Sequence, residues 1–205
     1  MTHLELQRLE VGPWPMNCYL LRCPQTGGLA IVDPGADAEK ILEAVGQAHV
    51  DCILLTHGHP DHVGALEDVR EATGAPVGIH PADAERFDVR AQIVLEDGLV
   101  VKVGAGQVRV THVPGHTPGS VCMRLNGEVV VGDAVFPGGP GYTASPEALA
   151  QSLNSLARTV FAWPDGTELY PGHGGHTTVQ AERAAFRRFL SAVHPADLYG
   201  DVTWG

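Results

Sequence analysis

The segment Thr56-His57-Gly58-His59-Pro60-Asp61-His62 decides how the rest of the chain is interpreted. It follows a short apolar run that predicts a buried strand. On extended backbone, side chains two residues apart project to the same side, so His57 and His59 face one way. Asp61 and His62 lie where the chain turns into a predicted helix, and they point in different directions. The spacing therefore predicts four ligands in two pairs, suited to two neighbouring metal ions.

Three further candidate ligands come directly after predicted strands. His116 lies in the loop Pro114-Gly115-His116-Thr117-Pro118-Gly119-Ser120, Asp133 follows an apolar strand, and His173 lies in Pro171-Gly172-His173. Many sites are built from such loop residues at one edge of a scaffold. We expect surface or core roles for the other six histidines, which lack this setting. The candidate metal ligands are His57, His59, Asp61, His62, His116, Asp133 and His173.

Hydrophobic periodicity predicts an α/β fold. The predicted strands cover 7–11, 17–23, 29–32, 52–55, 77–80, 99–103, 108–113, 121–125, 128–131 and 168–170. The predicted helices cover 38–48, a single stretch from 60 to 72, 82–87, 146–160 and 179–193. Two blocks of strands and helices around a β-rich middle predict a four-layer αββα sandwich, with two mixed sheets face to face and helices outside. We expect residues 1–205 to form a single domain, since no linker or repeat interrupts them.

The composition of the chain limits the classes of partner and the location that we expect for it. Of the 205 residues, 44% are hydrophobic, which indicates a globular chain. The formal net charge of −11 disfavours nucleic acid as a partner, because phosphates would be repelled. No apolar run approaches the ~20 residues that a membrane span needs. The four cysteines form no CxxC pair and are expected to be reduced and buried, in a cytoplasmic protein. The sequence leaves the oligomeric state open.

The candidate ligands resemble the metal-binding motifs of metallo-β-lactamase-fold hydrolases, and the resemblance extends over nearly the whole chain. The family's HxHxDH motif, later single histidine, Gly-Asp pair and last histidine all have counterparts among them. Asp33, in Val32-Asp33-Pro34-Gly35, matches an early Asp-x-Gly element and implies a supporting residue below the site. The resemblance implies a binuclear site in which one ion is held by His57, His59 and His116, the other by Asp61, His62 and His173, with Asp133 bridging them.

Such a site implies hydrolysis without a protein nucleophile. Two divalent ions about 3.5–4 Å apart can share a hydroxide near neutral pH, because they lower the pKa of the bound water. We expect this hydroxide to attack an ester, thioester or amide carbonyl, with Asp61 and Asp133 as catalytic carboxylates. The mixed His/Asp ligands suit Zn²⁺ best and also accept Fe or Mn. Ser120 has no evident base partner and is not expected to act as a nucleophile.

Within the family, the chain is most similar to the glyoxalase II-like group, which hydrolyses glutathione thioesters. The signatures of that group match Gly132-Asp133-Ala134-Val135-Phe136 and Pro171-Gly172-His173. The resemblance makes a small acyl thioester or ester the expected partner, with S-lactoylglutathione as the first candidate. Two departures concern glutathione binding: only 32 residues follow His173, and the segment after Phe136 lacks the Arg-Phe pattern of that group's substrate loop.

Other activities use the same scaffold. Persulfide dioxygenases hold a single iron with the equivalents of His57, His116 and Asp133, but they typically carry Ala where this chain has Pro60. A lactonase would use the same ligands on a cyclic ester, and a non-enzymatic module would hold its metal in a closed shell. β-Lactamases of the family usually lack a bridging Asp, and its RNA-processing members carry extra domains or arms, so both fit less well.

Overall fold

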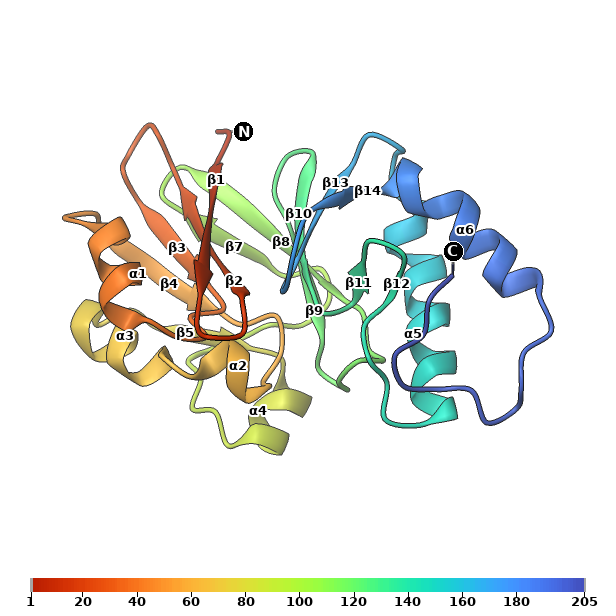
Figure 1. Ribbon diagram of the computed structural model, residues 1–205. Coiled ribbons are helices and arrows are strands. Elements are labelled where there is room, and N and C mark those ends of the chain that lie inside the picture. The colour runs from red at the N-terminus through yellow and green to blue at the C-terminus, as the bar shows by residue number, and fades with distance from the viewer. Residues whose placement is uncertain (1, 205) are drawn as a thin grey trace.

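The computed structural model describes residues 2–204. Two mixed β-sheets pack face to face, with helices α1 and α3 outside the first sheet and α5 and α6 outside the second (Figure 1). The helices are α1 (Ala38–Val45), α2 (Pro60–Val63), α3 (Leu66–Thr73), α4 (Pro81–Phe87), α5 (Pro146–Arg158) and α6 (Val179–Ser191), with a 3-10 turn at Val160–Ala162. The predicted four-layer αββα sandwich is confirmed.

Each sheet combines antiparallel and parallel pairs. The first has the order β1-β2-β3-β4-β5-β6, antiparallel from β1 to β3 and parallel from β3 to β6. Its strands are Glu5–Val11, Met16–Arg22, Leu29–Val32, Val50–Leu54, Val77–Ile79 and Ile93–Val94. The second has the order β14-β13-β10-β9-β8-β7, and only its β10–β13 pair is parallel. In chain order from β7 its strands are Val100–Val103, Gly106–His112, Val121–Arg124, Glu128–Gly132, Glu168–Pro171 and Thr177–Thr178.

Three hydrophobic clusters hold the layers together. One joins the first sheet to its helices through side chains such as Ile41 and Val69. A second joins the other sheet to α5 and α6 through Leu156 and Phe186. The third lies between the two sheets, where both faces are apolar. Burial on both faces explains why the central strands have apolar runs and no strict alternation.

The prediction of one helix from 60 to 72 is wrong, because the chain forms two helices, α2 and α3. The interruption lies where the segment presses against the loop that follows β3. The backbone N–H of Ala65 donates to the carbonyl of Pro34 at 3.0 Å, and a Cβ on Gly64 would lie 2.3 Å from the carbonyl oxygen of Gly35. This contact holds α2, which carries two candidate ligands, against the first sheet.

Four strands of two residues each were not predicted: β6, β14 and the separate hairpin of β11 (Val135–Phe136) and β12 (Gly139–Pro140). A strand of only two residues is too short to show a hydrophobic periodicity, so no sequence pattern could identify these four strands. All four cysteines are free and buried, as expected. Within residues 2–204, no helix is long and apolar enough to cross a membrane.

Candidate metal centre

All seven predicted ligands converge at one edge of the two sheets. They come from the loop after β4, helix α2, the loop between β8 and β9, the turn after β10 and the turn after β13. In three overlapping clusters their ligand atoms lie within 4.8 Å of one another: His57, His59 and His116; His57, His62 and Asp133; and Asp61, His62 and His173. The segments are far apart in sequence, so the site exists only in the folded chain.

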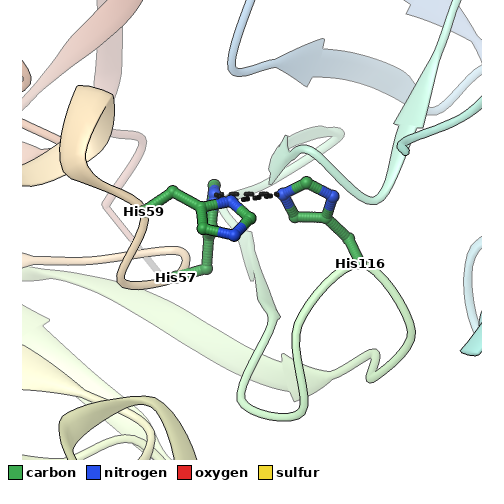
Figure 2. Close-up of side chains that lie close together, drawn as sticks. All are labelled: His57, His59 and His116. Carbon is green, nitrogen blue, oxygen red and sulfur yellow. Dashed lines mark hydrogen bonds between the residues drawn. The ribbon is translucent and has the colours of Figure 1, made fainter. Parts of the chain in front are cut away.

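The first cluster, which we call the three-histidine group, consists of His57, His59 and His116. His116 Nε2 lies 2.9 Å from His59 Nδ1 and 3.2 Å from His57 Nε2, and the latter two nitrogens are 3.1 Å apart. Figure 2 shows the rings of His57 and His59 facing that of His116, which comes from a separate loop. The first two histidines follow a strand of the first sheet, and the third lies between two strands of the second.

Hydrogen bonds at the outer ring nitrogens fix the tautomers of two of these histidines. His116 Nδ1 lies 2.8 Å from the carbonyl oxygen of Tyr142, which can only accept, so Nδ1 carries the proton. His57 Nδ1 lies 3.1 Å from Thr56 Oγ1, whose own proton is donated to Asp33. The Nε2 atoms of both rings therefore present lone pairs to the centre of the group. Such partners are what orient metal-binding histidines in proteins.

Two members of the three-histidine group, His57 and His59, favour the uncharged imidazole. Burial lowers the pKa of His57 well below its usual value, and the neighbouring His62 and His116 lower it further. Burial, followed by the proximity of His116, also lowers the pKa of His59. Neutral imidazole is the form that binds metal ions.

The third cluster, which we call the mixed group, consists of Asp61, His62 and His173 and contains its own ion pair. His173 Nε2 lies 3.1 Å from Asp61 Oδ2, while His173 Nδ1 donates to the carbonyl of Pro15 at 3.0 Å. The hydrogen bond from His173 lowers the pKa of Asp61 to about 2. The same bond raises the pKa of His173, which favours the charged imidazolium beside Asp61. Half of the Asp61 side chain is exposed, which makes it the open side of the group.

His62 is held from below by Asp33. The two side chains are fully buried, with His62 Nδ1 3.0 Å from Asp33 Oδ2. Asp33 also accepts from the backbone N–H of Thr56 at 2.7 Å, which ties the first motif to β3. Although burial alone would lower it, the nearby carboxylates of Asp133 and Asp33 raise the pKa of His62 to about 10. The structure thus places Asp33 in the supporting position that the resemblance implied.

Asp133 lies between the two groups. Its Oδ1 is 3.4 Å from His62 Nε2, and its Oδ2 is 3.7 Å from Nε2 of both His116 and His173. The backbone leaves room for it only because the neighbouring turn contains glycine: a Cβ on Gly172 would lie 2.2 Å from Asp133 Oδ1. Burial opposes its charge, but the surrounding histidines lower the pKa of Asp133.

The donor set fits a cation in each group. In the three-histidine group, the inner nitrogens meet at hydrogen-bond distance although two of them present lone pairs, an arrangement that repels unless a proton or a cation lies between them. Within residues 2–204, His62 Nε2 and Asp133 Oδ1 are buried and lack a hydrogen-bond partner. Buried polar atoms without partners are costly, and a shared cation would satisfy both.

Two further polar residues near the site, His112 and Ser120, lie outside the clusters. His112 Nε2 contacts the carbonyl of Pro118 at 2.9 Å, and its ring stacks on His80. Ser120 is buried and bonded to Thr117. Sequence reasoning missed one buried carboxylate, Asp83, which hydrogen-bonds the loops on both sides of the three-histidine group. Its only signal was an acid in the first turn of a short helix, which is common in helices of every kind.

The αββα fold and a His/Asp cluster at the sheet edge together define a class of metal-dependent enzymes. A profile described as the metallo-beta-lactamase superfamily matches residues 11–190, and the chain belongs to this superfamily. Its coarse activity is therefore that of the superfamily's metal-dependent hydrolases, while the substrate varies widely among members.

Three relatives illustrate that range. Over 203 residues the chain is 29% identical to the hydroxyacylglutathione hydrolase GloC of Haemophilus influenzae, covering 88% of this chain and 95% of that protein. It resembles the structure of TTHA1623 in a di-iron-bound form, with 34% identity, a TM-score of 0.71 and coverage of 86% and 96% of the two chains. It also resembles ETHE1 from Myxococcus xanthus, with 28% identity, a TM-score of 0.79 and coverage of 87% and 81%.

Proposed function

We propose that this protein is a binuclear metal-dependent hydrolase of small acyl thioesters, with S-lactoylglutathione as the first candidate substrate. One observation carries the proposal: two three-residue ligand groups lie side by side with a single carboxylate, Asp133, between them. Two divalent ions, Zn²⁺ first and Fe or Mn as alternatives, would supply an activated water and a Lewis acid for the substrate carbonyl.

The residues of the chain would bind and orient the reactants. The three-histidine group would hold one ion as a neutral site, and Asp61 would give the second site one negative charge. Asp133 reaches both groups, so it would space the ions and accept a hydrogen bond from a water held between them. Asp61, half exposed at the open side, is the carboxylate nearest to an entering substrate.

A small cavity beside Asp61 supports a small acyl substrate. Its volume is about 110 Å³, and its lining includes the apolar side chains of Val11, Trp14 and Met16. Trp14 lies in the turn between β1 and β2 and is 82% exposed. Such a space suits a short acyl group at the reacting carbonyl, while the thiol portion would extend toward solvent.

The likeness to GloC supports glutathione thioesters in particular. The match covers 88% of this chain and 95% of that hydroxyacylglutathione hydrolase. The proposed partner is thus a small molecule and neither nucleic acid nor a membrane. A cytoplasmic location is part of the proposal, because free thiols such as the four buried cysteines persist in reducing compartments.

The test combines metal analysis with a substrate panel. Protein purified without chelator should contain about two metal ions per chain. The panel consists of S-lactoylglutathione, other glutathione thioesters, simple thioesters, acyl lactones and a β-lactam. We expect thioester turnover with a KM higher than that of a full-length glyoxalase II, because the segment after Phe136 lacks the substrate-loop pattern of that group. Lactone turnover with inert thioesters would instead assign the protein as a lactonase.

The second candidate is a mononuclear iron persulfide dioxygenase, favoured by the likeness to ETHE1. It would use His57, His116 and Asp133, and the closest approach of His116 Nε2 to that carboxylate is 3.7 Å. One iron per chain, with oxygen uptake on glutathione persulfide and no thioesterase activity, would replace the hydrolase proposal with this one.

A further inference from the structure

Asp83 on α4 is a fully buried carboxylate that contacts the loops carrying the three-histidine group. It accepts three hydrogen bonds. The backbone N–H of Gly58, between His57 and His59, donates to Oδ2 at 3.0 Å. From the loop that carries His116, the Thr117 hydroxyl donates to Oδ2 at 2.7 Å and the Gly119 N–H donates to Oδ1 at 2.7 Å.

These two loops belong to different sheets. The loop with Gly58 follows β4 of the first sheet, and the loop with Thr117 and Gly119 connects β8 and β9 of the second. One carboxylate therefore joins the two halves of the molecule through the loops that carry the three histidines. Hydrogen bonds to a charged acceptor are shorter and stronger than neutral ones, so this connection is stiff.

Close packing leaves Asp83 no freedom to adopt another position. A Cβ on Gly119 would lie 2.6 Å from Asp83 Oδ1, so only glycine allows this approach. One helical turn later, Phe87 packs against Gly58, and its ring lies edge-on to His59 with centroids 5.3 Å apart. Residues four apart share a helix face, so α4 presents both side chains to the same loop.

The hydroxyl protons of the neighbouring network follow from this arrangement. Because an ionised carboxylate only accepts, the Thr117 proton is directed to Asp83. Ser120 Oγ, 2.7 Å from Thr117 Oγ1, must then donate to it, while accepting from the Thr117 N–H at 3.1 Å. The hydrogen bonds donated by Thr117, Gly119 and Ser120 thus hold the His116 loop in one conformation.

We propose that Asp83 is a positioning residue for the three-histidine group. It fixes the separation of the two loops, so that His116 meets His57 and His59 before an ion binds. The mixed group has no such dependence, because its hydrogen bonds run to Asp33 and to the carbonyl of Pro15. The inference rests on the metal site of the proposed function and not on its substrate.

The test is a calorimetric titration of the metal-free protein with Zn²⁺. In Asp83→Asn we expect one of the two metal equivalents to bind about 10- to 100-fold more weakly, the usual cost of losing a group that orients metal ligands. Thr117→Val, which removes one donor and keeps the carboxylate, should show a smaller loss at the same equivalent. Asp51→Asn is the matched control, because Asp51 accepts a backbone N–H of Gly104 at 2.8 Å, outside the site.

A second pair of variants identifies the affected site. In His116→Ala, which disables the three-histidine group, adding Asp83→Asn should not change the affinity of the remaining equivalent. In His173→Ala, the same addition should weaken it. Thermal unfolding of the metal-free variants is measured in parallel, since a purely structural role would lower the melting temperature and leave the Zn²⁺ affinity of the folded protein unchanged.

The outcomes separate this proposal from the proposed function. Unchanged affinity at both equivalents in Asp83→Asn and Thr117→Val, or an equal loss at both, would overturn the positioning role while leaving the hydrolase proposal intact. Two normal equivalents in the unchanged protein with no thioester turnover would overturn the substrate assignment alone. A protein that binds no Zn²⁺ would overturn both.

Discussion

The two ligand groups differ in what holds them together. The mixed group contains opposite charges, with His173 paired to Asp61 at 3.1 Å and His62 to Asp33 at 3.0 Å. The three-histidine group contains no carboxylate, and its inner nitrogens face one another at 2.9 to 3.2 Å. The mixed group is thus held by ion pairs, one between its own members and one to the supporting Asp33. The three-histidine group has no carboxylate among its members and depends on the surrounding loops for its geometry.

The largest effect should come from Asp133→Asn, which removes the carboxylate common to both groups. A neutral amide bridges cations poorly and leaves the positive charge of the site less balanced. We expect hydrolysis to fall by about 10²-fold or more, with weaker metal retention at both sites. Kinetics and elemental analysis of the purified variant measure this, and unchanged metal content and turnover would exclude a bridging role.

The next effect should come from removing one ligand of each group, with His116→Ala and His173→Ala. Each variant should lose one metal equivalent and retain the other, and hydrolysis should fall by about 10- to 100-fold, less than in Asp133→Asn. Metal analysis side by side with kinetics distinguishes the sites. If either variant lost both ions, the two groups would be one coupled site and the comparison above would fail.

The smallest effect should be the loss of stability on chelation. A ligand that binds only the folded state at 100 times its Kd contributes about 2.7 kcal/mol, which for a chain of this size is about 5–10 °C in melting temperature. In metal-free Asp83→Asn, where the connection between the two loops is weakened, the ring signals of His59 and His116 should broaden, while those of the mixed group stay sharp. NMR of the histidine rings checks this, and equal broadening in both groups would contradict the contrast.

The sequence predicted those parts of the site that are local in the chain. Four ligands lie within His57–His62, and the other three follow apolar strands, so each has a signal in its immediate neighbours. Asp83 has no such signal, because its role depends on two loops that only the tertiary fold brings to it. The assignment of each ligand to one of the two ions came from family resemblance, because the spacing of the residues in the sequence leaves it open.

The fold showed the same division. Apolar periodicity identified the long strands and four of the helices, and hence the layers. It failed at Gly64, where contact with the loop after β3 interrupts a pattern that is helical by sequence. It also failed at strands of two residues, whose pairing is decided by partners elsewhere in the chain.

The division of the three-histidine group between the sheets also bears on how the molecule unfolds. An ion bound by His57, His59 and His116 would be a reversible cross-link between segments almost sixty residues apart in the chain. A cross-link that closes a long loop restricts the unfolded ensemble. Local opening of either half would then require release of the ion. With the ion bound, both halves of the molecule would therefore unfold in one cooperative step, whereas the metal-free protein would unfold one half at a time.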